Sequence, residues 1–169
     1  MDFTIRNMLK EDWSDVYLIY RQGMESDLAT FTVEELNYEE FDHQRLKQGR
    51  FVILDQQKII GWTSLKKASE IPEYYGVAEV SIYLDQAYQG QGVGTTLLNH
   101  LVDYSEKIGF WTLEADILLE NQASQHLHEK CGFRLVGKRE RLGRDRHGHW
   151  RDTVLMERRS KKVGVDQAD

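Results

Sequence analysis

The sequence is poor in the residues that cross-link or interrupt a chain. Its 169 residues include one cysteine, Cys131, and one proline, Pro72. A single cysteine excludes a disulfide within the chain and a cysteine-rich zinc site. No apolar run approaches the roughly 20 residues that span a bilayer, and the first residues lack the basic and then apolar pattern of a signal peptide. We therefore expect a reduced, cytoplasmic protein.

Positive charge is also in deficit, because 22 basic residues face 28 acidic ones and give a net charge of −6. This balance argues against a general nucleic-acid binder or a binder of anionic membranes, since both need a basic surface. The charge is uneven, however. Residues 11–42 carry ten acids and one base, whereas residues 138–151 carry six bases and two acids. The net charge therefore averages an acidic and a basic segment.

Apolar periodicity predicts alternating strands and helices. A capping box of Thr32 and Glu35 is expected to start the second helix. The pattern predicts one α/β domain over residues 1–160, with a mixed sheet flanked by helices, and a polar C-terminal tail over 161–169. Strands are expected at 3–9, 51–54, 59–65, 77–84, 111–118, 133–142 and 149–157, and helices at 12–22, 32–47, 93–108 and 121–131.

The glycine-rich segment 89–95, with the sequence QGQGVGT, lies between a predicted strand and a predicted helix. Glycines let the backbone approach a ligand closely, and a helix N-terminus attracts anions, so this loop predicts a phosphate site. A Walker loop is excluded because no lysine follows Gly94. A dinucleotide fingerprint fits poorly but stays open, since Glu114 would suit the ribose acid. A loop that binds no ligand also stays open.

Several motifs resemble the GNAT superfamily of N-acetyltransferases. Gln89-x-x-Gly92-x-Gly94 matches the acetyl-CoA motif of that family, and the likeness continues through residues 120–124, 127–133 and 148–152. Residues 78–83, together with the late Gly-x-Trp-x-Asp, are similar to the phosphinothricin N-acetyltransferase branch, and residues 139–144 to its arsinothricin-acetylating members. The resemblance implies the GNAT fold, with a mostly antiparallel sheet of six or seven strands. It also implies acetyl-CoA as co-substrate, no metal, and a homodimer.

The resemblance also implies where acetyl-CoA binds. The pantetheine arm would lie along the strand that precedes the glycine loop, and the loop would hold the pyrophosphate. Asn121, Ser124 and His128 are spaced to share one helix face, which would look toward the CoA arm. The cofactor-binding residues expected on this basis are Ile82, Tyr83, Leu84, Gln89, Gly90, Gln91, Gly92, Val93, Gly94, Thr95, Asn121 and Ser124.

Two residues are expected to be catalytic. Strand alternation places Glu79 on the opposite face from Val80, and we interpret it as the general base, since only a neutral amine attacks a thioester. A solvent-exposed carboxylate is the alternative. His128 occupies the position where many family members carry a tyrosine that protonates the leaving thiolate. Cys131 is expected to be an inert buried thiol.

The resemblance suggests the α-amino group of a small amino acid, such as phosphinothricin, methionine sulfoximine or arsinothricin, as acceptor. Substrate contacts are expected from Glu79, Val80, Ser81 and Lys66. Related enzymes carry arginines near positions 69–71, where this chain reads Ser-Glu-Ile, so Lys66, Lys67 or an arginine of 138–151 would have to bind the acceptor's anionic groups. The acidic stretch suggests a polyamine, aminoglycoside or protein N-terminus instead. A CoA-binding module without turnover is a third hypothesis.

Overall fold

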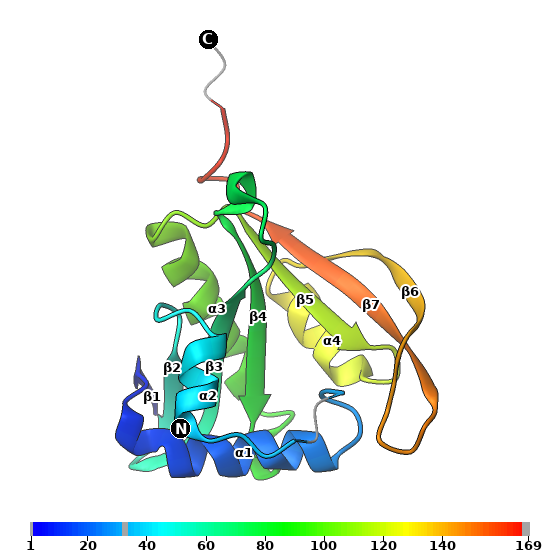
Figure 1. Cartoon of the computed structure of the whole chain (residues 1–169). Coiled ribbons are helices and arrows are strands. Elements are labelled where there is room, and N and C mark those ends of the chain that lie inside the picture. The colour runs from blue at the N-terminus through cyan, green and yellow to red at the C-terminus, as the bar shows by residue number, and fades with distance from the viewer. Residues whose placement is uncertain (1, 32–33, 167–169) are drawn as a thin grey trace.

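The computed structural model describes residues 2–31 and 34–166. Its centre is a seven-stranded sheet in the order β1-β2-β3-β4-β5-β7-β6 (Figure 1). Every neighbouring pair is antiparallel except β4 and β5, which are parallel. The predicted mixed, mostly antiparallel sheet is therefore confirmed. The strands are β1 (Phe3–Asn7), β2 (Phe51–Asp55), β3 (Lys58–Lys67), β4 (Val77–Leu84), β5 (Thr112–Leu118), β6 (Arg134–Arg144) and β7 (Trp150–Arg159).

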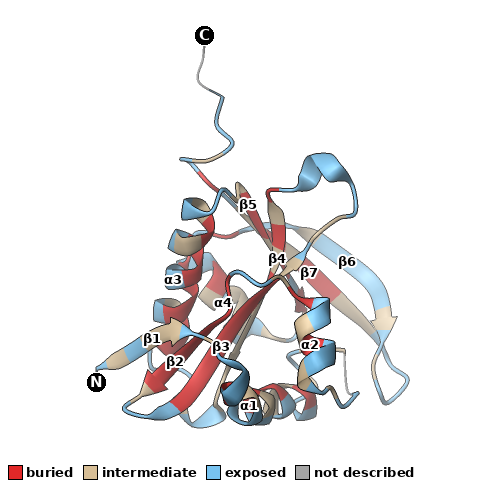
Figure 2. Cartoon of the chain, turned by 60° about the vertical axis from the view of Figure 1, so that its left-hand side comes forward, coloured by how far each residue is buried: buried red, intermediate tan, exposed pale blue. Residues whose placement is uncertain are grey.

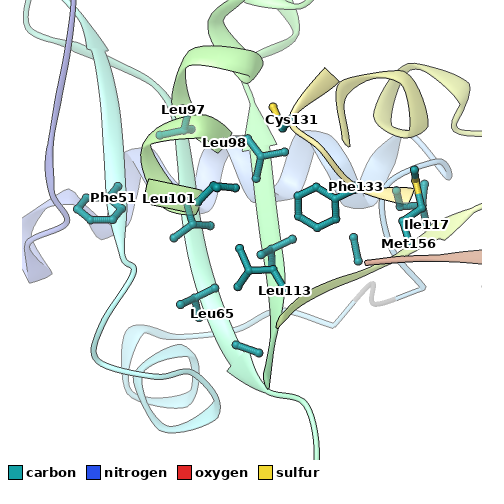
Figure 3. Packing of buried hydrophobic residues seen from close by; sticks show 14 of the residues in the cluster. Phe51, Leu65, Leu97, Leu98, Leu101, Leu113, Ile117, Cys131, Phe133 and Met156 are labelled. Atoms are coloured by element: carbon teal, nitrogen blue, oxygen red, sulfur yellow. The ribbon is translucent and has the colours of Figure 1, made fainter. Parts of the chain in front are cut away.

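In the described ranges, four α-helices pack on the sheet: α1 (Trp13–Glu25), α2 (Tyr38–Gln44), α3 (Val93–Lys107) and α4 (Gln122–Lys130). The apolar stripe of α3, formed by Leu97, Leu98 and Leu101, packs against side chains of the strands in one core cluster (Figure 3). A second cluster joins α1 and α2 to Trp62 of β3. Figure 2 shows buried residues concentrated in the central strands and exposed ones along β6. The two clusters fix the helices that surround the site described below.

The parallel pair β4 and β5 is joined over a short distance only. Its ladder runs from Val77 opposite Thr112 to Glu79 opposite Glu114. Beyond Glu79, the described ladder joins no further residue of β4 to β5, and the two strands diverge toward their C-terminal ends (Figure 1). The C-terminal half of β4 therefore has one edge with no strand beside it, and Glu79 lies where the strands part.

The second predicted helix, over 32–47, is wrong in its extent. The observed helix α2 begins after Asn37, whose side-chain oxygen accepts a hydrogen bond from the Glu40 amide at 2.9 Å, while the Glu40 carboxylate accepts one from the Asn37 amide at 2.9 Å. This reciprocal box starts the helix. The helix ends before Arg45, whose backbone is extended (φ −126°, ψ 152°). Thr32, the cap that the sequence suggested, lies outside the described residues.

The remaining predicted helices and strands are present, with small differences at their ends. Residues 69–76, expected as a loop, include a short 3-10 turn at Pro72–Tyr74. Beyond β7, the side chain of Ser160 accepts hydrogen bonds from the amides of Lys162 and Val163, both at 3.0 Å. Within the described part of the chain, no helix has the length and apolar character needed to cross a membrane.

Candidate active site

Two cavities adjoin where β4 and β5 diverge. The first, of about 570 Å³, runs beside the glycine loop and is called the loop groove here. The second, of about 340 Å³, is lined by Glu79 and is called the Glu79 pocket. Both are lined by Ala29, Ile82, Tyr83, Asn121 and Ser124, so the two cavities share a wall.

The backbone of the glycine loop shapes one end of the loop groove. Gly90 and Gly92 have φ values of +74° and +81°, in the left-handed region that favours glycine. A side chain added at either position would meet nothing within 4 Å, so the space in front of this backbone is open. Helix α3 begins at Val93, directly after Gly92, and its first-turn amides have no partner within the helix. The loop therefore offers free amides and a positive helix terminus to an anion.

Most of the residues predicted to bind the cofactor line the loop groove. Two do not: the side chain of Val93 is fully buried in the core, and that of Gln91 donates to the carbonyl of Ala87 at 3.0 Å. For these two, only the backbone remains available to a ligand. The lining residues that the sequence predicted are Ile82, Tyr83, Leu84, Gln89, Gly90, Gly92, Gly94, Thr95, Asn121 and Ser124.

The Glu79 pocket is built on two paired strands. Lys66 of β3 lies opposite Glu79 of β4, and Ser64 lies opposite Ser81. Because alternate residues of a strand point to the same face, these four side chains share one face of the sheet. The four predicted substrate contacts, Glu79, Val80, Ser81 and Lys66, all line the pocket.

The charged groups around Glu79 influence one another. Burial lowers the pKa of Lys66, the positive charge of Arg45 lowers it further, and Glu79 acts in the opposite direction. Burial also raises the pKa of Glu114, which lies opposite Glu79 on β5, and the negative charges of Glu157 and Glu79 add to that shift. The pKa is therefore lowered for Lys66 on β3 and raised for Glu114 on β5, the two strands that flank β4.

Helix α4 and its cap bring Asn121, Ser124 and His128 to the Glu79 pocket, so the three share one face, as their spacing predicted. His128 is 2% exposed, and its Nδ1 lies 2.7 Å from the carbonyl oxygen of Ser124. A carbonyl only accepts, so Nδ1 carries the proton and Nε2 of the neutral ring is an acceptor. Burial lowers the pKa of His128, and the Ser124 carbonyl opposes that shift in part. The ring is neutral near pH 7.

Asn121 holds the shared wall of the two cavities. Its side-chain oxygen accepts from the Ser124 amide at 3.2 Å and caps α4, while its Nδ2 donates to the carbonyl of Leu28 at 3.0 Å. One side chain thus fixes the start of α4 and ties the segment after α1 to it.

The sequence did not identify Arg45, which also lines the Glu79 pocket. Arg45 is 6% exposed. Its Cζ lies 4.9 Å from the ring centre of Phe41, 5.4 Å from that of Trp62 and 5.9 Å from that of Tyr20. Its Nη1 donates to the hydroxyl of Ser64. Placed within a predicted helix of 32–47, Arg45 gave no sign of burial. It turns inward because α2 ends one residue earlier.

Several other charged residues that the sequence singled out form ion pairs away from the pocket. In the basic segment, Arg146 pairs with Asp27 at 2.8 Å and Arg151 with Glu120 at 3.0 Å, while Lys67 on β3 pairs with Glu70 at 3.0 Å. No acid of residues 11–42 is among the described residues that line either cavity. The negative charges of this stretch therefore do not line the site, although some of its uncharged residues do.

Comparisons with known proteins agree with this geometry. The sequence model of the Acetyltransferase (GNAT) family matches residues 5–133. The chain is 27% identical over 159 residues to the L-amino acid N-acyltransferase MnaT of Escherichia coli K12, covering 91% of this chain and 92% of that protein. It is 31% identical over 131 residues to the spermidine N(1)-acetyltransferase of Vibrio cholerae, covering 70% and 73% of the two chains.

Among solved structures, the chain is similar to a GNAT superfamily phosphinothricin acetyltransferase from Sinorhizobium meliloti in complex with acetyl-CoA. The TM-score is 0.88 at 27% sequence identity, with 100% of this chain and 94% of that chain covered. The seven-stranded sheet, the glycine loop at the start of α3 and the family match over most of the chain lead to one conclusion. This chain belongs to the GNAT family of acetyltransferases.

Proposed function

We propose that this acetyltransferase acetylates the α-amino group of a small amino acid, such as phosphinothricin, methionine sulfoximine or arsinothricin, with acetyl-CoA as the acetyl donor. One observation carries the proposal. A carboxylate, Glu79, and two cations, Arg45 and Lys66, line one pocket that shares a wall with the loop groove. This set of charges suits an acceptor with an amine that must lose a proton and an anionic group that must be bound.

The loop groove is the proposed site for acetyl-CoA. The backbone from Gly90 to Thr95 would donate hydrogen bonds to the pyrophosphate, because left-handed glycines and a helix N-terminus present free amides there. The free edge of β4 at Ile82–Leu84 would pair with the pantetheine amides. The bound thioester supplies the acetyl group, and its position along β4 would bring it to the shared wall next to Glu79.

Glu79 is the proposed general base. An α-ammonium group is mostly protonated at pH 7, and the nitrogen attacks the thioester carbonyl only after it has lost a proton. Glu79 sits where β4 and β5 part, half-buried and within the pocket. Its carboxylate would accept the ammonium proton, either directly or through a water molecule.

His128 is the proposed proton donor to the departing thiolate, with one requirement set by its hydrogen bond. Because Nδ1–H is committed to the Ser124 carbonyl, the neutral ring has no second proton to give. Nε2 must first take one up, and the nitrogen of the tetrahedral adduct, which has a proton to lose after the attack, would supply it. The lowered pKa of His128 makes the resulting imidazolium a stronger acid than an exposed one, so it would release the proton readily to the thiolate.

A second candidate acceptor is a polyamine, which the similarity to a spermidine N(1)-acetyltransferase favours. Two observations weigh against it. The cations Arg45 and Lys66 would repel a polyamine in the Glu79 pocket, and the acids of residues 11–42 lie outside the lining of both cavities. A CoA-binding module without turnover would not need Glu79 and His128 placed beside the groove.

The test is a thiol-release assay with acetyl-CoA and a panel of the three amino acids and spermidine. We expect turnover with at least one amino acid. Glu79→Gln should lower kcat/KM by roughly 10²- to 10⁴-fold while leaving the Kd for acetyl-CoA unchanged. The exposed Glu73→Gln variant serves as control. Turnover with spermidine alone would replace the proposed acceptor. Binding of acetyl-CoA without thiol release in the presence of any of the acceptors would favour the binding module. An unchanged rate in Glu79→Gln would remove Glu79 as the base.

A further inference from the structure

Arg45 is a buried cation that forms no ion pair with any carboxylate of the described residues. Most other arginines of the described chain form ion pairs with carboxylates, and Arg45 does not. Its polar contacts are the hydroxyls of Ser64 and Tyr20, and three aromatic rings surround it. The negative charge of Glu79 favours its protonated form but makes no ion pair with it, and its Nε is buried with no hydrogen-bond partner. Burial of a charge is costly unless it is paired and fully hydrogen-bonded. The guanidinium is therefore incompletely satisfied in the free protein.

The register of the sheet places Arg45 close to the reacting groups. Ser64, which Arg45 contacts, lies opposite Ser81, and Ser81 is two residues from Glu79 on the same face of β4. Lys66, directly opposite Glu79, is near enough for its pKa to be lowered by the charge of Arg45. The guanidinium and the ammonium thus face one pocket from neighbouring positions.

Among the described residues that line the pocket, little negative charge offsets these two cations. Among the described lining residues, the carboxylates are Glu79 and Asp116, and Asp116 already pairs with Arg139. With Glu79 as the one remaining negative charge, the lining carries a surplus of positive charge. An anionic ligand would supply the missing partner, and the planar fork of a guanidinium matches the two oxygens of a carboxylate.

We infer that Arg45 binds the α-carboxylate of the acceptor, with Lys66 adding a second positive charge, so that the enzyme selects free amino acids over amines that lack a carboxylate. This inference rests on the proposed function. It assigns anion recognition to a residue directly after α2, in place of the arginines that positions 69–71 lack. Because the carboxylate and the amine of an amino acid share one carbon, binding the carboxylate at Arg45 would also direct the amine toward Glu79.

The experiment pairs two acceptors with a set of variants. L-methionine sulfoximine and its α-carboxamide differ in the negative charge that Arg45 is inferred to bind. The carboxamide also has a less basic amine, so each variant is compared with wild type for the same acceptor. In Arg45→Gln, KM for the acid should rise by roughly 10- to 100-fold, the range for hydrogen bonds to a charged group. KM for the carboxamide should change by less than about threefold, since that acceptor has no charge to lose. Lys67→Gln, next to Lys66 but paired with Glu70, should leave both values unchanged.

A structural role for Arg45 predicts a different result, because loss of packing would affect both acceptors alike and would also weaken acetyl-CoA binding. Equal changes for the acid and the carboxamide would therefore overturn the inference. If Arg45→Gln does not fold, Arg45→Lys makes the same comparison. It keeps the charge but not the fork, and its KM for the acid should lie between those of wild type and an uncharged site.

Measurements on the wild-type enzyme distinguish a failure of the proposed function from a failure of the inference about Arg45. No turnover with any amino acid would refute the proposed function and this inference with it. Turnover of acid and carboxamide with equal KM would refute the inference alone. The proposal that the enzyme acetylates a small amino acid would stand. A wild-type preference for the acid that Arg45→Gln removes is the expected result.

Discussion

The loop groove and the Glu79 pocket share a wall but are built in different ways. One end of the loop groove is formed by the backbone of consecutive residues around Gly90 and Gly92, at the start of α3. The Glu79 pocket is formed by residues from α1 and the segment after it, from the segment after α2, from the strands β3 to β7, and from α4. A backbone site for an anion can serve any acceptor, whereas the identity of the acceptor depends on side chains that only the tertiary structure assembles.

The largest effect that would test this difference is expected at Gly92. Its φ of +81° disfavours a β-branched residue, and a strained position of this kind costs about 1–3 kcal/mol. In Gly92→Val the loop should relax and move its amides, which would raise the Kd for acetyl-CoA by roughly 5- to 150-fold. Isothermal titration calorimetry would measure it.

Gly148 is a matched control for this change. It also has a φ of +81°, and a side chain there would likewise meet nothing within 4 Å, but it lies in the turn between β6 and β7. Gly148→Val should leave the Kd for acetyl-CoA unchanged. Equal affinity in Gly92→Val and wild type would show that the loop backbone does not hold the anion, and the contrast between the two cavities would lose its basis.

The same difference explains what the sequence could predict. The glycine loop, the strand 77–84 and the spacing of Asn121, Ser124 and His128 are contiguous or periodic features, and the structure has all of them. Local chemistry was enough to place them. The family model, which matches residues 5–133, covers the same segments.

Arg45 could not be found in this way. The patterns Thr32-x-x-Glu35 and Asn37-x-x-Glu40 both fit a capping box, and the sequence does not distinguish them. Only the second is seen to start a helix among the described residues. The inward turn of Arg45 also depends on Tyr20, Phe41 and Trp62, which come from three separate elements. Burial that depends on contacts between residues far apart in the sequence cannot be predicted from a local pattern.

A smaller effect is expected at Asn121, because it belongs to both cavities. Asn121→Ala removes the cap of α4 and the hydrogen bond to Leu28, and loss of a cap costs about 0.5–2 kcal/mol. Thermal unfolding should show a lower Tm, by about 2–4 °C for each kcal/mol in a chain of this size. Asn121→Ser should recover the cap but not the bond to Leu28, since serine caps as well as asparagine. Equal Tm values for both variants and wild type would contradict both roles.

The smallest expected effect is a pH dependence of folding stability that comes from the Glu79 pocket and not from the glycine loop. Backbone amides of the loop do not titrate, whereas His128 does. The lowered pKa of His128 means that the unfolded chain binds a proton that the folded chain rejects. The stability that comes from keeping this ring neutral is complete above the unfolded pKa of about 6.5. It falls as the pH drops from there toward the folded pKa, by at most about 1.4 kcal/mol per pH unit.

Denaturant unfolding at pH 7.5 and 5.5 should show this loss in wild type and a smaller loss in His128→Asn. The exposed neighbour in His126→Asn should keep the wild-type difference. An equal pH dependence in all three proteins would mean that the buried ring does not control it, and the proton route proposed through Nε2 would lose its support.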